Sequence, residues 1–405
     1  MAIQHDEDAA DDLLAAHNRL DGPIGWQAAA ATFLATFTVF GVAYSFGSFF
    51  GPMADEFGTD RGATAFFFAI TTFLYFALGV ISGHVADSRG PRPVLLFGAV
   101  FLVGGLLATS RVSSIWLGYL TYGLGVGIGV ACAYVPMVAA VGGWFERQRT
   151  TALGIAVAGI GVGTLTVAPL SEWLIEQYGW RQSYVILAVG AAVLLALASL
   201  GAHRPVHVSR RAGETSPLRE IVRTERDFRI LYLAMALMST ALFVPFVFLP
   251  DYLDTEGITG PAGWLIGLIG ISSVVGRLGL GALASRFSSM RLYRGSFLVL
   301  SLSFLIWLVA GQSYVALAVF AIILGVAYGG FIALSPAVTA ELFGPAGLGA
   351  VLGALYTAAG IGGLFGPPLM GRLIDSFGYS SALVVAMVFG LASTTVLLGL
   401  GRSHR

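Results

Sequence analysis

The sequence predicts an all-α membrane protein with twelve transmembrane helices in two six-helix bundles. Of the 405 residues, 57% are hydrophobic and only 11% are charged, whereas soluble domains carry about 25% charged residues. The mean hydropathy is +0.83. Twelve apolar segments each approach the roughly 20 residues that a helix needs to cross a bilayer, and parts of the second six repeat the first six.

The first six segments follow an acidic N-terminal tail, residues 1–25. This tail lacks the basic start and apolar core of a signal peptide, so we expect it to stay in the cytoplasm. The predicted helices of the N-terminal bundle, residues 26–202, are 26–50, 63–83, 94–110, 114–141, 150–174 and 182–202.

The longest polar stretch between apolar segments, residues 203–227, separates the set into six and six. We expect this stretch to be a cytoplasmic central linker. The predicted helices of the C-terminal bundle, residues 228–401, are 228–250, 263–285, 293–311, 314–339, 348–371 and 380–401.

Arginine placement predicts the orientation, because cytoplasmic loops are enriched in Lys and Arg. All 22 basic residues are arginine. If both termini are cytoplasmic, 17 arginines lie on the cytoplasmic side and Arg277 lies within a span. Only four lie outside: Arg61, Arg111, Arg181 and Arg372. This asymmetry favours an even number of spans.

The two halves repeat at a fixed offset. Residues 154–180, shifted by 199, fall on residues 353–379 with nine identities and no gap, among them Gly154, Gly161 and Pro169. At a shift of 200, Gly125 and Pro136 match Gly325 and Pro336. The fifth helix therefore corresponds to the eleventh, and this pair of parallel six-helix repeats resembles the plan of major facilitator transporters.

The loop after the second helix reads "GHVADSRGPRP", residues 83–93. It resembles the major facilitator signature G-x-x-x-D-[RK]-x-G-[RK]-[RK], although Ser88 and Pro91 occupy positions that are usually basic. The resemblance implies a conformational latch in which a carboxylate meets a helix N-terminus or an arginine. A solvated loop without such a role is the alternative. The candidate latch residues are Gly83, Asp87, Arg89, Gly90 and Arg92.

A narrower resemblance spans nearly the whole chain. The motif "DGPIGW", residues 21–26, is similar to the start of the first helix in the monocarboxylate porter family. The stretches 46–58, 144–149 and 178–187 are also similar to that family, which includes oxalate–formate exchangers. The resemblance implies that aromatic residues on the fourth and tenth helices line the substrate site. Tyr122 and Tyr328 are the residues that match best.

Arg277 is the candidate anion-binding residue because it carries a charge deep in the eighth span. It lies nine residues before Arg286, about 13 Å deeper along a helix. Arginine at mid-bilayer costs about 2.5–3.5 kcal/mol, and no Asp or Glu lies deep in any span to pair with it. A guanidinium can bind a carboxylate through two parallel hydrogen bonds. A purely structural arginine, held by backbone carbonyls, is the alternative.

Other polar residues could face the same site from neighbouring helices. For each of them, helix packing is an alternative interpretation. The candidates are Tyr44, Ser48, Thr72, Tyr75, Ser273 and Tyr356.

Several function classes are disfavoured by what the sequence lacks. The absence of lysine excludes a Walker A phosphate loop, and zero net charge gives no reason to expect a nucleic-acid partner. The single Cys132 excludes an intramolecular disulfide and a cysteine metal site. All six histidines lie in loops or at helix ends. We therefore expect no metal, no cofactor and no enzymatic activity.

The most consistent function is secondary transport of a small organic monoanion such as lactate, pyruvate or formate, by alternating access. Ser273 stands where animal members of the family usually have Asp, and the eleventh helix has no second cation. Symport, antiport and protons as coupling partner stay open. A multi-substrate exporter and a non-transporting carboxylate sensor are the alternatives. We expect a monomer in a prokaryotic plasma (inner) membrane, with the bilayer and a small carboxylate as its partners.

Overall fold

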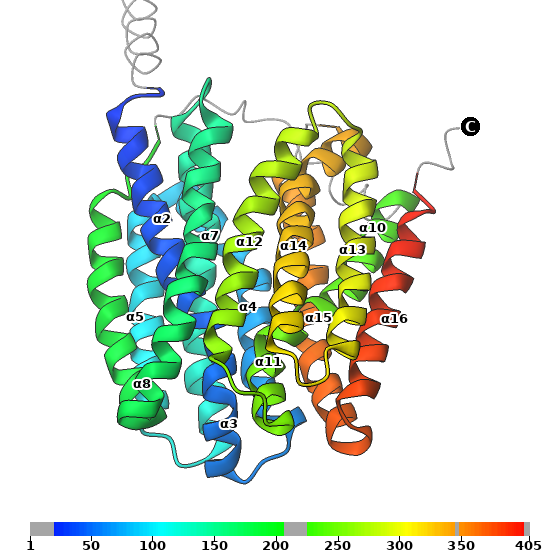
Figure 1. The fold of residues 1–405 in the computed structure, drawn as a ribbon. Coiled ribbons are helices and arrows are strands. Elements are labelled where there is room, and N and C mark those ends of the chain that lie inside the picture. Colours follow the sequence, from blue (N-terminus) through cyan, green and yellow to red (C-terminus); the bar gives the residue numbers. More distant parts are fainter. Residues whose placement is uncertain (1–19, 206–224, 345–347, 401–405) are drawn as a thin grey trace, which may run out of the picture.

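The structure is a computed structural model that describes residues 20–205, 225–344 and 348–400. All regular elements within these ranges are helices, and the long ones run side by side across the molecule (Figure 1). Most of the predicted N-terminal tail and of the predicted central linker lies outside the described residues. α2 begins and α16 ends at the same end of the bundle, at the top of Figure 1, as an even number of crossings requires.

The first half of the chain contains the elements up to α8, which follow the first six predicted segments. Their bounds are α2 Pro23–Tyr44, α3 Phe46–Phe57, α4 Arg61–Arg89, α5 Pro91–Thr109, α6 Ile115–Gly118, the π-helical η1 Tyr119–Leu124, α7 Gly125–Trp144 and α8 Arg149–Leu200. The second half contains α10 Arg226–Leu242, α11 Val244–Glu256, α12 Ala262–Leu283, α13 Ser289–Val309, α14 Tyr314–Phe343, α15 Leu348–Phe377 and α16 Tyr379–Leu397.

One element, α8, accounts for two of the predicted crossings. It has 52 residues, which would extend about 78 Å if straight, far more than a bilayer core of about 30 Å. Gly179 interrupts it with non-helical backbone angles, φ 74° and ψ 160°. The described residues contain eleven helices long and apolar enough to cross a membrane, and the division of one at Gly179 gives the predicted twelve.

The first and seventh predicted helices are each broken near the middle, where the sequence predicted continuous segments. The breaks fall at Ser45 and Phe243. Pro245 lacks a backbone N–H and so removes a helical hydrogen bond at this point, which favours a break before it, and it occupies the first turn of α11. Both broken helices end at a glycine with positive φ, Gly58 in the first half and Gly257 in the second. Gly58 and Gly257 are 199 residues apart, the same offset that relates residues 154–180 to residues 353–379. The sequence repeat is therefore also present in the backbone geometry.

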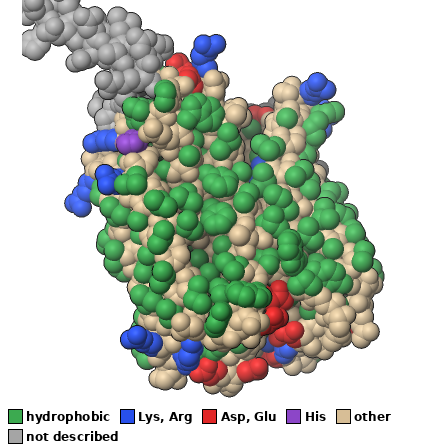
Figure 2. Space-filling view, turned by 60° about the vertical axis from the view of Figure 1, so that its left-hand side comes forward, with side chains coloured by type: hydrophobic (Ala, Val, Ile, Leu, Met, Phe, Trp, Pro, Cys, Tyr) green, Lys and Arg blue, Asp and Glu red, His purple; other side chains and the backbone are tan. Residues whose placement is uncertain are grey.

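Charged side chains gather at the two ends of the molecule, and an apolar band lies between them (Figure 2). Large apolar side chains of this band face outward, such as Val100 at 70% and Val309 at 79% exposure. A continuous outward-facing apolar surface of this kind is expected for contact with lipid, as in a multi-pass membrane protein. We call the end where α2 begins the terminal face, and the opposite end, where α4 begins, the Arg61 face.

Asp21, from the motif "DGPIGW", fixes the start of the first span to the turn before α8. Its carboxylate accepts hydrogen bonds from the backbone N–H groups of Arg147, at 3.1 Å, and Gln148, at 3.0 Å. Desolvation opposes the charged form, but these hydrogen bonds outweigh it and lower the pKa of Asp21 from its ordinary value. The motif therefore has a structural role at the terminal face.

The two halves meet most closely toward the Arg61 face. α4 packs against α15, α8 against α12, and α3 against α11. A Cβ on Gly263 would come within 2.7 Å of the Pro169 backbone, whereas one on Gly154, nearer the terminal face, would be 3.5 Å from Leu278. Figure 2 shows a notch between two lobes at the terminal face. This conformation is therefore closed at the Arg61 face.

Candidate functional site

Arg277 lies inside the span formed by α12, nearer to its last residue, Leu283, than to its first, Ala262. The helical rise places it about 22 Å from the start of the helix and about 9 Å from its end. Its Nη1 donates a hydrogen bond to the backbone carbonyl of Val157 on α8, at 3.0 Å. Because α8 and α12 belong to different halves, this contact joins the two halves at the candidate site.

The other edge of the Arg277 guanidinium is buried and unpartnered. Nε and Nη2 have no hydrogen-bond partner among the described residues, although both atoms are shielded from solvent. No carboxylate of the described residues forms an ion pair with Arg277. Buried donors that lack a partner are unfavourable, and the Nε–Nη2 edge is one that a carboxylate can bind through both of its oxygens.

Aromatic side chains surround this guanidinium. The Cζ atom of Arg277 lies 5.8 Å from the centre of the Tyr328 ring, within the range of a cation–π interaction. The phenol groups of Tyr134 on α7 and Tyr356 on α15 are also near enough to interact with Arg277 electrostatically. The charge is thus set among polarisable rings and hydroxyl groups from both halves.

Tyr44 connects these rings to the first half. Its phenol oxygen lies 3.2 Å from that of Tyr328 on α14, and its ring stacks on Phe246 of α11 with centroids 4.4 Å apart. Tyr75 on α4 is buried and lies near enough to Tyr44 and Tyr328 to interact with both, although its hydroxyl forms no hydrogen bond of normal geometry with any described residue. The structure therefore brings together five of the predicted site residues, namely Arg277, Tyr328, Tyr44, Tyr75 and Tyr356.

Of the four remaining predicted residues, Tyr122 and Ser273 make their contacts away from the Arg277 guanidinium, and Ser48 and Thr72 show no contact with it. Tyr122, on η1, packs with Phe46, Phe67 and Tyr184, an aromatic cluster in the first half. Ser273 donates to the carbonyl of Gly270 on its own helix. The hydroxyl groups of Ser48 and Thr72 are buried and form no hydrogen bond with any residue that the structure describes.

Sequence reasoning missed Tyr134 and the Val157 carbonyl. Tyr134 could have been found from its depth in the membrane, measured along the helix from Arg147 at the terminal face. At the helical rise Tyr134 lies about 20 Å from Arg147, whereas Tyr122 lies about 37 Å from it. Arg277 lies about 13 Å from Arg286 by the same measure, so its depth is closer to that of Tyr134 than to that of Tyr122. No sequence signal identifies Val157, because its side chain is apolar and only its backbone oxygen takes part.

The loop motif of residues 83–93 forms the turn between α4 and α5 at the terminal face. Gly90 ends α4 with φ 86°, a backbone conformation that favours glycine. The backbone carbonyl of Asp87 accepts a hydrogen bond from Arg204, at 2.8 Å. Arg89 is the last residue of α4, Arg92 is exposed on α5, and Gly83 faces Val135 of α7. A latch between the halves stays a prediction for these residues.

The Tyr44–Tyr328 pair makes a stability prediction. Tyr44→Phe removes one hydroxyl and leaves the buried Tyr328 hydroxyl without its partner, which should destabilise the protein by about 1–3 kcal/mol. Tyr122→Phe is the matched control, because the Tyr122 hydroxyl is buried and has no hydrogen-bond partner in the described part of the chain, so its loss should not destabilise the protein. Thermal unfolding midpoints in detergent test this. A control that unfolds as early as Tyr44→Phe would contradict the assignment.

Comparisons with known proteins agree on one family. The Major Facilitator Superfamily model matches residues 32–313 and 262–404. Monocarboxylate transporter 13 of Rattus norvegicus is 30% identical over 386 residues, covering 94% of this chain and 90% of the relative. Monocarboxylate transporter 12 of Homo sapiens is 29% identical over 424 residues, covering 94% and 81%.

Solved structures share the same fold at low sequence identity. The nucleoside transporter NupG, in a variant form, superposes with a TM-score of 0.72 at 15% identity, covering 93% of this chain and 98% of that one. A bacterial homologue of the human lysosomal transporter Spinster, in an inward-facing and unoccupied conformation, gives a TM-score of 0.70 at 14% identity, covering 93% and 96%.

Proposed function

The chain belongs to the monocarboxylate transporter family of the major facilitator superfamily, and from this membership we propose that it transports small organic monoanions by alternating access. Lactate-, pyruvate- and formate-like carboxylates are the proposed substrates. Two helical bundles, residues 26–202 and 228–401, would rock about the site at Arg277. The bundles perform transport and no covalent chemistry, and the proposed unit is a monomer.

The observation that carries this proposal is the buried, unpartnered Nε–Nη2 edge of Arg277. A carboxylate would supply two acceptors to this edge and neutralise its charge, while Nη1 keeps its bond to the Val157 carbonyl. In this arrangement α8 orients the guanidinium and α12 carries it. Tyr44, Tyr75, Tyr328 and Tyr356 would then contact the rest of the substrate through ring faces and hydroxyl groups.

The terminal face is proposed to be cytoplasmic. Exposed arginines gather on it, among them Arg89, Arg92 and Arg147, as the positive-inside rule expects. The setting would be the plasma (inner) membrane of a prokaryote with both termini inside. The conformation described above, closed at the Arg61 face, would then be closed toward the outside.

Counterflow in proteoliposomes tests the proposed function. Vesicles loaded with unlabelled lactate, pyruvate or formate are diluted into the same labelled compound, and a carrier accumulates the label transiently. A carboxylate sensor that does not transport would bind the label without such an overshoot. The multi-substrate exporter is the second candidate, and transport of lipophilic cations in preference to carboxylates would favour it. The Nε–Nη2 edge of Arg277, which has no partner among the described residues, favours anions.

Charge matching predicts selectivity against dianions. One buried cation neutralises one carboxylate, so oxalate or succinate would bring a second charge into a site of low dielectric, which is costly. Unlabelled monocarboxylates should therefore inhibit the uptake of a labelled monocarboxylate at concentrations about tenfold or more lower than either dianion. This factor corresponds to half of the penalty of about 2.5–3.5 kcal/mol for an unpaired charge at mid-bilayer. Equal inhibition by the dianions at the same concentration would contradict the proposed site.

A further inference from the structure

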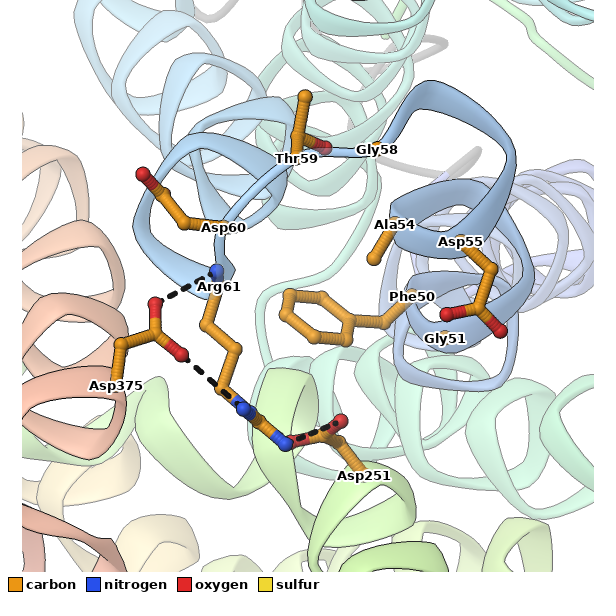
Figure 3. Close-up of a pocket in the computed structure, with 10 residues that line it drawn as sticks. All are labelled: Phe50, Gly51, Ala54, Asp55, Gly58, Thr59, Asp60, Arg61, Asp251 and Asp375. Carbon is orange, nitrogen blue, oxygen red and sulfur yellow. Dashed lines mark hydrogen bonds and ion pairs between the residues drawn. The ribbon is translucent and has the colours of Figure 1, made fainter.

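A second charged cluster lies far from Arg277, at the Arg61 face. There a cavity of about 350 Å³ is lined by residues from both halves of the chain. Arg61, the first residue of α4, crosses this cavity between Asp375 of α15 and Asp251 of α11 (Figure 3). The ring of Phe50 from α3 lines the same cavity. The cluster therefore occupies the place where the two halves meet.

Arg61 binds Asp251 through two nitrogens. Its Nε donates to Oδ2 at 2.6 Å, and its Nη2 lies 3.4 Å from Oδ1. The same Nη2 donates to the hydroxyl of Thr255 at 3.1 Å. Tyr379, on α16, donates its phenol proton to Asp251. The carboxylate of Asp251, with a side chain only 13% exposed, thus joins α4 to two helices of the other half.

Arg61 also binds Asp375, through its side chain and its backbone. Nη1 donates to Oδ1 at 3.1 Å, and the backbone N–H of Arg61 donates to Oδ2 at 2.9 Å. That N–H belongs to the first turn of α4, where the backbone has no helical acceptor and favours negative charge. Two carboxylates of the second half therefore hold one residue of the first half from two sides.

These contacts do not belong to the folding of either half alone. The hydrogen bonds from Arg61 to Asp251, Thr255 and Asp375 each join residues that are at least 190 positions apart and lie in different halves. The other ion pair of the described residues, Arg181–Glu56, lies within the first half. A contact between residues of different halves is present when this face is closed, and it must break when the two halves separate there.

We propose that Arg61, Asp251 and Asp375 form a latch that holds the Arg61 face closed and whose release is required for this face to open. The latch rests on the alternating access of the proposed function, but it acts without substrate. It is separate from the Asp87 loop, which lies at the opposite end of α4. Glu172 reinforces the closure on the neighbouring interface, because its carboxylate accepts from the first two N–H groups of α12, those of Ala262 and Gly263.

The test measures access from the Arg61 face with a single cysteine. The native Cys132 is changed to serine, and Ser48→Cys serves as the reporter. On α3, Ser48 lies about one turn deeper than the cavity-lining Gly51 and nearly two turns deeper than Ala54. Within the described ranges the Ser48 hydroxyl forms no hydrogen bond, so cysteine should be tolerated there. A membrane-impermeant maleimide is added on the Arg61 side in the absence of substrate, and the labelling rate is recorded.

Arg61→Gln should increase the labelling rate by about threefold or more. Loss of a partly exposed ion pair shifts the equilibrium between the closed and the open Arg61 face by about this factor. Asp251→Asn and Asp375→Asn, which each remove one charged acceptor and keep the arginine, should act in the same direction. Arg111→Gln is the matched control, since Arg111 is exposed on the same face and should leave labelling unchanged. Size-exclusion profiles identify any variant that fails to fold.

Rates in the latch variants that equal the rate in Arg111→Gln would overturn the proposal, even if only the two Asn variants fold. Faster labelling in these variants together with an unchanged control supports it. The result is independent of the proposed substrate. Failure of counterflow with normal labelling behaviour would reject the transport proposal alone, and normal counterflow with unresponsive labelling would reject the latch alone.

Discussion

Replacing Arg277 with lysine should lower the kcat/KM of transport by about 10- to 100-fold, which corresponds to a charge-assisted hydrogen bond worth about 1.5–3 kcal/mol. Lysine keeps the charge but lacks the planar fork. In the wild type, Nη1 holds the Val157 carbonyl and so orients the guanidinium, and Nε and Nη2 stay free to bind the substrate. Lysine has a single side-chain nitrogen and cannot do both. The expected loss is therefore one of geometry rather than of charge.

The measurement is initial uptake of a labelled monocarboxylate into proteoliposomes at matched protein content. Arg286→Lys is the control, because Arg286 is exposed just beyond the end of the same helix and should transport normally. A monodisperse size-exclusion peak for Arg277→Lys separates loss of transport from loss of folding. Transport by this variant at near wild-type rates would be incompatible with two-pronged binding at Arg277.

Exchange of substrate across the membrane should be about tenfold or more faster than net flux. An empty carrier has to move Arg277 through the occluded state with Nε and Nη2 unpartnered, whereas a loaded carrier moves it neutralised. If even half of the roughly 2.5–3.5 kcal/mol for an unpaired arginine applies, the return of the empty carrier is slowed by about tenfold. The same expectation holds for symport and for antiport.

The experiment compares uptake of label into vesicles that contain unlabelled substrate with uptake into vesicles that contain chloride. Both sets have the same volume, ionic strength and pH gradient, so that only the internal substrate differs. Acceleration by internal substrate is the expected result. Equal initial rates in the two sets would show that Arg277 crosses as easily empty as loaded, and this explanation of its unpartnered edge would be rejected.

The fold was predictable because a bilayer leaves few alternatives. A spanning segment has to satisfy its backbone hydrogen bonds internally, so an apolar segment of the right length forms a helix. The gap between the fifth and sixth predicted helices, residues 175–181, contains Gly179, and the structure interrupts α8 at that residue. The mid-helix breaks at Ser45 and Phe243 were not predicted, although Pro245 was visible in the sequence and explains the second one.

The site was predictable in its charge and less so in its surroundings. Arg277 was identified because an arginine inside a span is energetically expensive and so needs a reason to be there. Its neighbours Tyr134 and Val157 were missed. α7 and α14 are apolar on all sides, because lipid and protein interior are equally apolar, and such helices carry little pattern that shows which face points inward.

The sequence by itself determined the membrane class, the twelve crossings, the internal repeat and the presence of Arg277 within a span, because each follows from local composition or spacing. The tertiary structure alone decided which partners these residues meet. Arg61 lies 190 residues from Asp251 and 314 from Asp375, and its charge looked like an ordinary loop arginine. Its role emerges only when the two halves pack against each other, since contacts between halves depend on helix rotation and depth, which apolar spans do not encode locally.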